Sequence, residues 1–359
     1  MKIGLVGLPK SGKTSLFNLL TGASLATSSY GGSRAEMHSG VARVPDERVD
    51  RLSALFKPKK TTFASFEVVD LAGISKGERE GLDAKEFRNA DALLHVVRAF
   101  PDAAGTAPNP KGDIGDLETE LILADLEVVE RRLERLEAQI KKKRTDADVY
   151  EQTVLQKVKP LLESERPIRA MGLADDEARA LRGFTFLSQK PILHCLNLSE
   201  KEIARGTTLA ESFGLQAVGQ RPATRLGWVS AVIESEVAQL AGPEQAAFLA
   251  DLGLTEPAIG RVLQDCYALL GLISFFTVGE DEVRAWSVPR GTRAQDAAGA
   301  IHSDIARGFI RAEVVGYEEL CAALGSMAAV HEKGQFRLEG KDYVVEDGEI
   351  CHFRFNVAK

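Results

Sequence analysis

The sequence predicts an α/β protein with a largely parallel sheet, followed by a smaller module rich in strands. Two observations predict it. Short apolar runs alternate with helical patterns along the N-terminal two thirds of the chain. A glycine-rich motif of the form G-x-x-x-x-G-K-[ST] stands between the first expected strand and the first expected helix. The length of 359 residues suits two or three domains.

Composition and charge narrow the class of protein. The 45 Lys and Arg against 52 Asp and Glu give a net charge of -7, which argues against a protein that coats nucleic acid, so we expect no DNA partner. No apolar run is long enough to cross a membrane, and the N-terminus lacks a signal-peptide pattern, so we expect a cytoplasmic protein. The four cysteines are scattered, which is typical of buried reduced thiols and not of a zinc site.

The first expected strand covers residues 2–7, and the first helix begins at Lys13. A polar segment from Ala23 to Gly40 is expected to be a loop. Apolar runs then predict further strands at residues 40–45, 63–70 and 92–97. His95 lies within the last of these strands and is expected to be a core residue.

The middle of the chain changes character. Residues 101–115 are rich in Pro, Gly, Ala and Asp, which predicts a linker. From Leu117 onward turn residues almost vanish, and a break at residues 141–148 separates two helical segments. Steps of three and four residues place the apolar residues of the first segment on one helix face, at Leu126, Val129, Leu133, Leu136 and Ile140. We therefore expect an inserted antiparallel helical hairpin.

The α/β pattern resumes at residues 191–200 with an apolar strand that runs into a polar loop, and residues 228–233 are a second strand candidate. Helical segments then reach about Leu272. From Ile273 the chain is expected to form a separate small module. Its expected elements are a hairpin at 274–279 and 282–289, a helix at 294–309, and strands at 310–315, 343–347 and 351–356.

The strongest chemical signal is the segment from Gly7 to Thr14, which fits the phosphate-binding loop pattern and has the expected strand and helix on either side. Its glycines let backbone N–H groups surround phosphate oxygens, and the following helix points its positive end at the same anion. We expect Lys13 to reach the β- and γ-phosphates and the Thr14 hydroxyl to bind Mg²⁺. The candidate nucleotide-binding residues here are Gly7, Pro9, Lys10, Ser11, Gly12, Lys13, Thr14 and Ser15.

The second signal is Asp70-Leu71-Ala72-Gly73, which follows the strand at 63–70. An acid at the carboxyl end of a strand near a phosphate-binding loop is placed to hold Mg²⁺ through water, and the backbone N–H of Gly73 is placed to meet a γ-phosphate. A bare D-x-x-G is also an ordinary strand-end turn. Together with the phosphate-binding loop it predicts a GTPase-like switch domain.

The third signal is Asn197-Leu198-Ser199-Glu200, at the end of the strand PILHCL. GTPases carry N-K-x-D here, and the aspartate accepts two hydrogen bonds from guanine. With Leu198 for lysine and Glu200 for aspartate, an apolar side chain is expected to face the base or ribose, and adenine becomes the better candidate. Ser230 and Ala231 fit the S-A element whose backbone touches the base, although this dipeptide alone is too common to count.

Long segments of this chain resemble the Obg-like ATPase family, the YchF type of P-loop protein. They include GLPKSGKTSLFNLLTGA, VPDERVDRLSALFKPKK, EVVDLAG, ISFFTVGEDEVRAWSV and IHSDIARGFIRAEVVGYEEL. The resemblance implies a G domain at residues 1–112 and 189–274, a helical coiled-coil insertion at 113–188, and a C-terminal TGS module, a ubiquitin-like β-grasp, at 275–359. It also implies a preference for ATP over GTP and an association with ribosomes.

The chain departs from the family pattern at several positions. Lys10 replaces an asparagine that helps to seat K⁺ in related GTPases, so we expect little dependence on K⁺; the alternative is that Lys10 points to solvent. No threonine stands in the first switch; Ser33 is a possible Mg²⁺ ligand there, and Arg34 could instead neutralise γ-phosphate charge. Ile74 stands where Ras-like proteins carry a glutamine that positions water, and the loop before the insertion lacks the family's histidine. Intrinsic hydrolysis is therefore expected to be slow.

Two main interpretations of the function follow. One is a slow ATPase whose nucleotide state rearranges its loops, its helical hairpin and its TGS module. The other is a nucleotide sensor with negligible turnover, and a GTPase is a weaker alternative.

A basic run that could bind a partner lies at the expected hairpin turn, where residues 131–160 carry nine Lys or Arg against five Asp or Glu. Such a run is either a solvated tip or a contact for ribosomal RNA: Lys141, Lys142, Lys143 and Arg144.

Overall fold

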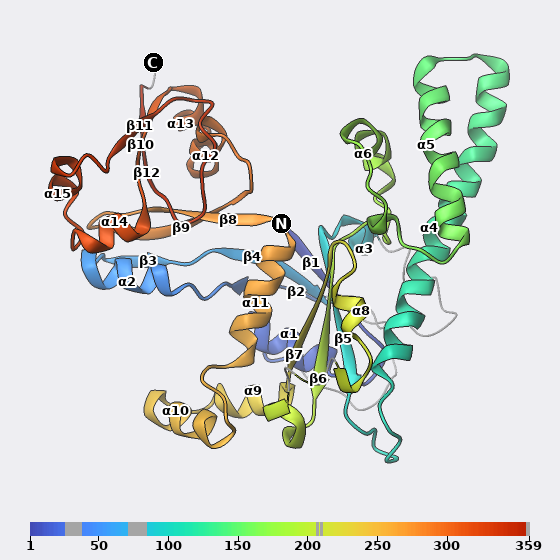
Figure 1. Cartoon of the computed structure of the whole chain (residues 1–359), viewed down its shortest axis with the longest axis horizontal. Helices are drawn as coiled ribbons and strands as arrows, with labels where there is room; N and C mark the ends of the chain where they lie inside the picture. The colour runs from blue at the N-terminus through green and yellow to red at the C-terminus, as the bar shows by residue number, and fades with distance from the viewer. Residues whose placement is uncertain (26–37, 71–84, 206–207, 209–210, 357–359) are drawn as a thin grey trace. The chain divides into compact units, whose positions relative to one another are not determined.

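The computed structural model describes residues 1–25, 38–70, 85–205, 208 and 211–356, and the chain divides into two compact units (Figure 1). The first unit comprises Met1–Val41 and Glu67–Leu269. The second comprises Ala42–Phe66 and Leu270–Lys359. The α/β class expected from the sequence is confirmed in both.

The first unit is built around a six-stranded sheet with the strand order β2-β4-β1-β5-β6-β7. The pairs β1–β4, β1–β5, β5–β6 and β6–β7 are all parallel. Every residue of β6 is buried, as expected for a central parallel strand that is covered on both faces. The strands are β1 (Lys2–Val6), β2 (His38–Arg43), β4 (Ser65–Asp70), β5 (Ala92–Ala99), β6 (Ile192–Leu198) and β7 (Thr224–Val229).

Helices pack around this sheet. The sequence predicted a strand at residues 228–233, but only its first two residues are in a strand. Strand β7 ends at Val229, Ser230 is the N-cap residue of α9, and α9 begins at Ala231. Ser230 has an extended backbone, with φ -113° and ψ 107°, and its side chain makes no capping hydrogen bond. The expected loop at 23–40 also ends early, because β2 begins at His38. The α-helices here are α1 (Lys13–Thr21), α3 (Lys85–Asn89), α6 (Asp175–Leu181), α8 (Gln216–Gly219), α9 (Ala231–Val237), α10 (Gly242–Asp251) and α11 (Ala258–Leu269), and the 3₁₀ helices are η1 (Ile168–Ala170), η2 (Arg182–Phe184) and η3 (Glu200–Arg205).

The expected helical hairpin is confirmed as α4 (Pro110–Lys142) and α5 (Asp146–Glu163) (Figure 1). The predicted apolar face of α4 packs against α5: Val129 and Leu136 are fully buried in their shared core. The prediction that the linker extends from residue 101 to residue 115 is wrong at its C-terminal boundary, because α4 begins at Pro110. Asn109 caps it by accepting a hydrogen bond from the Gly112 N–H, and proline suits the first helical position. None of the described helices combines the length and apolarity that crossing a membrane requires.

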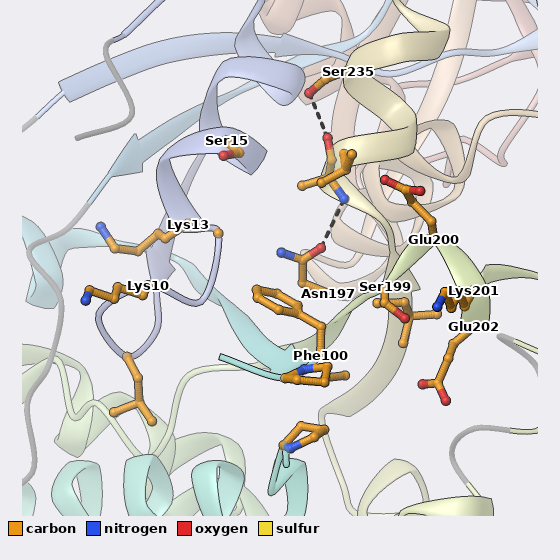
Figure 2. Close-up of a pocket in the computed structure, with 18 of the residues that line it drawn as sticks. Lys10, Lys13, Ser15, Phe100, Asn197, Ser199, Glu200, Lys201, Glu202 and Ser235 are labelled. Carbon is orange, nitrogen blue, oxygen red and sulfur yellow. Dashed lines mark hydrogen bonds between the residues drawn. The ribbon is translucent and has the colours of Figure 1, made fainter. Parts of the chain in front are cut away.

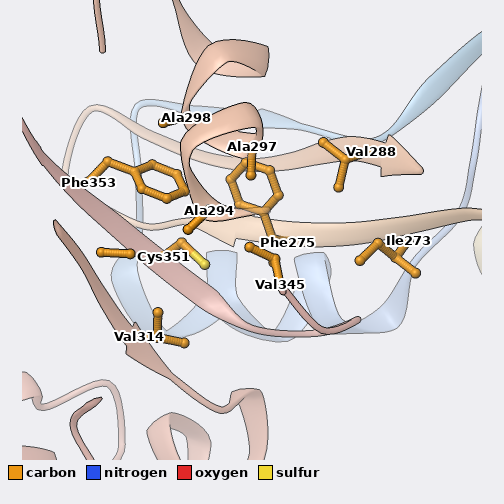
Figure 3. Packing of buried hydrophobic residues seen from close by; sticks show 11 residues of the cluster. Ile273, Phe275, Val288, Ala294, Ala297, Ala298, Val314, Val345, Cys351 and Phe353 are labelled. Atoms are coloured by element: carbon orange, nitrogen blue, oxygen red, sulfur yellow. The ribbon is translucent and has the colours of Figure 1, made fainter. Parts of the chain in front are cut away.

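The second unit has its own six-stranded mixed sheet, in the order β11-β10-β12-β8-β9-β3. Figure 3 shows its core, in which Ala294 and Ala297 of α12 face Phe275 and Phe353 of the strands. The strands are β3 (Lys60–Thr62), β8 (Leu272–Thr277), β9 (Glu282–Pro289), β10 (Phe309–Val315), β11 (Arg337–Glu339) and β12 (Ile350–Phe355), and the helices are α2 (Glu47–Phe56), α12 (Ala294–Ile301), α13 (Ser303–Arg307), α14 (Tyr317–Ala322) and α15 (Met327–Glu332).

Three expectations for this unit need correction. The helix expected at 294–309 is interrupted at His302, whose extended backbone ends α12 and whose side chain caps α13. Residues 343–347 form only an isolated bridge between Val344 and Arg293. Residues 42–66 do not belong with the first unit, because β3 pairs in register with β9, with Lys60 opposite Glu282.

Candidate functional site

The phosphate-binding loop connects β1 to α1 in the first unit, as the sequence predicts. Gly12 is the N-cap residue of α1 and has a φ of 92°, a left-handed conformation that favours glycine. A Cβ atom at Gly12 would lie 2.2 Å from the Asn197 Nδ2 atom, and one at Gly7 would lie 2.6 Å from the Val96 carbonyl oxygen. The loop therefore needs glycine at both positions, because its backbone runs directly against β5 and Asn197.

The two residues assigned to phosphate and metal, Lys13 and Asp70, contact each other. The Lys13 Nζ atom forms an ion pair with the Asp70 Oδ1 atom, at the start of α1 and the end of β4, and both side chains are largely buried. Parallel strands place these groups at the same edge of the sheet. The remaining switch candidates, Gly73, Ser33, Arg34 and Ile74, lie outside the described residues.

Asn197 joins two parts of the site by two hydrogen bonds, of which Figure 2 draws the one to the Ala231 N–H. Its Nδ2 atom donates to the Ser11 carbonyl oxygen at 2.9 Å, and its Oδ1 atom accepts from the Ala231 N–H at 3.0 Å. Asn197 is 5% exposed, so both bonds are shielded from water. The side chain therefore fastens the phosphate-binding loop to the S-A element, which the sequence did not predict.

A cavity of about 1590 Å³ opens in front of these elements. Its walls come from the phosphate-binding loop, residues 99–101 and 107–108, residues 197–202, Phe213 and one face of α9. Many of the predicted binding residues line it, namely Pro9, Lys10, Gly12, Lys13, Thr14, Ser15, Asn197, Leu198, Glu200 and Ala231. The other three, Gly7, Ser11 and Ser230, are buried behind the wall.

The cavity has one strongly cationic end. Lys10, Lys13 and the N-terminus of α1 lie there, an arrangement that attracts an anion such as a polyphosphate. The Thr14 hydroxyl and the Asp70 carboxylate are oxygen donors of the kind that Mg²⁺ prefers. In the described parts of the chain no three His, Cys, Asp or Glu side chains gather as a metal site. These donors fit a Mg²⁺ ion that takes its other ligands from phosphate and water.

Comparisons with known proteins agree with this geometry. A family model described as "50S ribosome-binding GTPase" matches residues 2–146, and the model YchF-GTPase_C, described as a protein of unknown function, matches residues 272–356. The chain is 44% identical to the "Ribosome-binding ATPase YchF" of Bacillus subtilis, covering 99% of both chains. It is 35% identical to "Obg-like ATPase 1" of Oryza sativa, covering 100% of this chain and 93% of the relative. The chain belongs to the YchF/Obg-like ATPase family.

The fold of this YchF/Obg-like protein also matches a solved relative. The YchF GTPase of Schizosaccharomyces pombe superposes with a TM-score of 0.85 at 29% identity, over 99% of this chain and 97% of the other. The fold expected from the resemblance, a P-loop GTPase-type domain followed by a C-terminal domain, is therefore confirmed.

Two base-site candidates of this YchF/Obg-like protein differ in their surroundings. Leu198 is 2% exposed and packs with Leu215 and Val218 in a core cluster, so little of it is left to face a nucleotide. Glu200 is exposed at the start of η3 and lines the cavity. Glu200 therefore exposes its carboxylate at the cavity, whereas most of the Leu198 side chain is packed in the core.

Sequence reasoning missed part of the cavity wall. Phe100 lies between the strand expected at 92–97 and the linker expected at 101–115, and Pro108 lies in that linker. Val232 lies in the strand candidate at 228–233, Ser235 follows that candidate, and both belong to α9. Val232 is 54% exposed, an unusual position for a large apolar side chain that its place on the cavity wall explains. The aromatic Phe100, directly after an apolar strand, was the one signal in the sequence that could have pointed to this wall.

Proposed function

We propose that this protein is a nucleotide-dependent switch that binds and slowly hydrolyses ATP, prefers ATP to GTP, and associates with ribosomes. The observation that carries the proposal is the phosphate-binding loop, fastened by Asn197 and lined with Lys13 and Thr14, at the cationic end of a large cavity. The names of the relatives, which are ribosome-binding ATPases, support the same function.

In the proposed mechanism, Lys13 and the backbone N–H groups at the start of α1 bind the phosphates and offset the charge that develops on them. Thr14 and Asp70 would hold Mg²⁺, which supplies Lewis-acid stabilisation of phosphate oxygens when it is bound. Because Lys13 and Asp70 pair with each other, a triphosphate competes with Asp70 for the Lys13 ammonium. Nucleotide binding is thereby linked to a change in the partner of Asp70.

Three assignments in this proposal rest on the sequence. Gly73 is proposed to sense the γ-phosphate through its N–H, and Ser33 to complete the Mg²⁺ site. Lys10 is exposed at the cavity, with a φ of 64°, and its ammonium supplies a cation near the phosphate end. We therefore propose that hydrolysis does not require K⁺.

Steady-state phosphate release tests the proposed activity. The wild type is expected to release phosphate from ATP slowly, and Asp70→Ala is expected to reduce that rate by about 10- to 100-fold, since the variant loses a proposed Mg²⁺ ligand. Equal rates in the wild type and Asp70→Ala would show that the signal is not turnover at this site. ATP binding without such turnover would favour a nucleotide sensor.

The Glu200→Asp variant tests base choice. An aspartate at this position is the residue that accepts two hydrogen bonds from guanine in GTPases, so we expect the ratio of ATP to GTP affinity to fall by about tenfold. Competition binding with both nucleotides measures this ratio. Leu198→Lys is unsuitable as a companion change, because it would bury an ammonium group in a core cluster. An unchanged ratio would show that Glu200 does not read the base.

The tip of the helical hairpin is the proposed ribosome contact. Lys141 and Lys142 are the last residues of α4, and Lys143 and Arg144 follow them. All four are exposed, and Lys141 pairs with Glu137 at 2.8 Å. Reversing all four charges to glutamate is expected to abolish co-sedimentation with ribosomes, because the contact would be with phosphate groups. The control reverses Lys111 and Arg166, which are exposed elsewhere in the first unit. Unchanged binding of the tip variant at low salt would contradict the proposal.

We further propose that the second unit serves as the TGS module, with residues 42–66 as part of it, and that the protein acts in the cytoplasm. The helical insertion is proposed to span residues 113–188, extended at its start to Pro110 by the observed helix. The second unit's mixed sheet, covered by α12, supports its assignment as a β-grasp.

A further inference from the structure

A buried polar array in the first unit takes no part in the cavity. His95 of β5 and His194 of β6 are register partners on neighbouring strands, and they are 1% and 0% exposed. Their Nδ1 atoms lie 3.0 Å apart, and their rings meet edge to face at 75°. A bonded pair of imidazoles in the middle of an apolar sheet is costly unless it is satisfied, so its further partners matter.

The array continues from the sheet to the base of the helical hairpin. The His194 Nε2 atom lies 3.4 Å from a carboxylate oxygen of Glu118 on α4. The same carboxylate forms an ion pair with Arg169 of η1. Arg169 also donates to the Ser188 carbonyl oxygen at 3.1 Å and to the Thr224 hydroxyl at 3.3 Å. One set of polar contacts therefore joins β5, β6, α4 and η1.

The protons of this array can be placed by counting. A bond between two Nδ1 atoms contains one hydrogen, so one imidazole donates and the other accepts. The His194 Nε2 atom makes no hydrogen bond among the described residues, but it faces the Glu118 carboxylate at 3.4 Å, and a hydrogen on this nitrogen is favoured because a lone pair there would repel the carboxylate. The His194 Nδ1 atom is then the acceptor. His95 therefore donates. A further proton on His194 would place two hydrogens between the rings and break the bond.

The surroundings keep both rings neutral near pH 7. Burial lowers the pKa of His95 well below its usual value, and the neighbouring His194 lowers it further. Burial also lowers the pKa of His194, against the opposing effect of Glu118, and Arg169 and Arg221 add to the lowering. Burial opposes the ionisation of Glu118, yet His194 and Arg169 hold its pKa below its usual value. The carboxylate is thus charged and both imidazoles are neutral.

The other end of the array lies beneath the phosphate-binding loop. His95 is the register partner of Val6, the last residue of β1 before the loop. The next residue along β5, Val96, has its carbonyl oxygen against Gly7, where a Cβ atom would come within 2.6 Å. The backbone of β5 therefore contacts the loop at the point where the array begins.

We propose that His95, His194 and Glu118 act as positioning residues that couple the phosphate-binding loop to the base of the helical hairpin. This inference rests on the proposed nucleotide binding. Glu118 and Arg169 hold α4 against β6. When β5 shifts beneath the phosphate-binding loop, the pair of His95 and His194 transmits that shift to Glu118 and so to α4. The hairpin thereby responds to the occupancy of the cavity, and the response requires the neutral histidine pair.

The test is hydrogen exchange in the full chain, with and without ATP, in the wild type and in His95→Leu/His194→Leu. Replacing both imidazoles by apolar groups of similar size removes the link and leaves Glu118 paired with Arg169, so the variant is expected to fold. In the wild type we expect ATP to change exchange in the base of α4, residues 114–125, by about fivefold or more. In the variant ATP is expected to bind while this factor falls to about one.

The pH dependence separates coupling from simple stability. In the wild type the response of α4 to ATP is expected to persist at pH 6.5, the ordinary histidine pKa, because folding lowers the pKa of both imidazoles, and to disappear at a lower pH where His194 takes up a proton and the histidine pair breaks. The wild type should also lose stability there, because its unfolded state takes up protons before its folded state does. The leucine variant should show no response of α4 to ATP at any pH in this range.

The control is Arg132→Gln, which breaks the ion pair with Glu151 between α4 and α5 at 2.6 Å, outside the array. It should keep the full response of residues 114–125 to ATP. A leucine variant that binds ATP and keeps the wild-type response would overturn this inference and leave the proposed function intact. A wild type that binds no ATP would overturn both, and the binding measurement distinguishes the two cases.

Discussion

Replacing Lys13 by alanine is expected to lower ATP turnover by about 100- to 1,000-fold, since one preorganised cationic donor to the phosphates is lost. Lys13 is the side chain at the cationic end of the cavity that can meet both the nucleotide and Asp70. Its removal also leaves Asp70, which is 7% exposed, next to the phosphate site without its ion-pair partner. Both changes disfavour an anionic ligand, so ATP affinity should fall together with turnover.

Steady-state phosphate release and ATP binding, measured on the same preparation, check this result. The matched control is Lys333→Ala, which removes one positive charge from an exposed position in the second unit. It should keep wild-type turnover. If Lys13→Ala retained more than about a tenth of the wild-type rate, Lys13 would not be the phosphate-binding lysine.

Replacing Asn197 by alanine is expected to have the second largest effect. The change leaves the Ser11 carbonyl oxygen and the Ala231 N–H without their buried partner, which should cost about 2–4 kcal/mol of the free energy of unfolding. ATP affinity should fall as well, by about tenfold or more, because the phosphate-binding loop is no longer fastened to the S-A element. Denaturant unfolding and nucleotide titration measure the two effects.

Destabilisation alone should not reproduce this result. Thr145→Ala removes the N-cap hydrogen bond of α5 to the Asp148 N–H and is expected to cost about 1 kcal/mol of stability. Its ATP affinity should equal that of the wild type. An Asn197→Ala variant with reduced stability but wild-type ATP affinity would show that Asn197 supports the fold without organising the site.

The parts of the fold that could be predicted have strong local patterns. The strand, glycine-rich loop and helix at the N-terminus follow each other directly in the sequence, and β1 and α1 lie where expected. The face of α4 that packs on α5 follows from its three- and four-residue steps. In both cases the residues that decide the structure are neighbours in the chain.

The missed features depend on residues that are distant in the chain. Residues 42–66 carry no sign that β3 will pair with β9, more than 200 residues later. Asn197 was expected to read a base, but its two bonds to Ser11 and Ala231 appear only when β6 is placed beside the loop. The part of the cavity wall at Phe100 was not predicted, because the Pro- and Gly-rich sequence after Phe100 is typical of a linker. The pairing of His95 with His194 likewise needs the register of β5 and β6.

The most direct test of the central claim is a calorimetric titration of the wild type with ATP, GTP and a hydrolysis-resistant analogue of each. The account predicts that ATP and its analogue bind saturably, and more tightly than GTP and its analogue. It does so because the cavity has a phosphate-binding loop and because Glu200 lines the part of it proposed to hold the base. Absence of saturable binding, or tighter binding of GTP, would contradict the account.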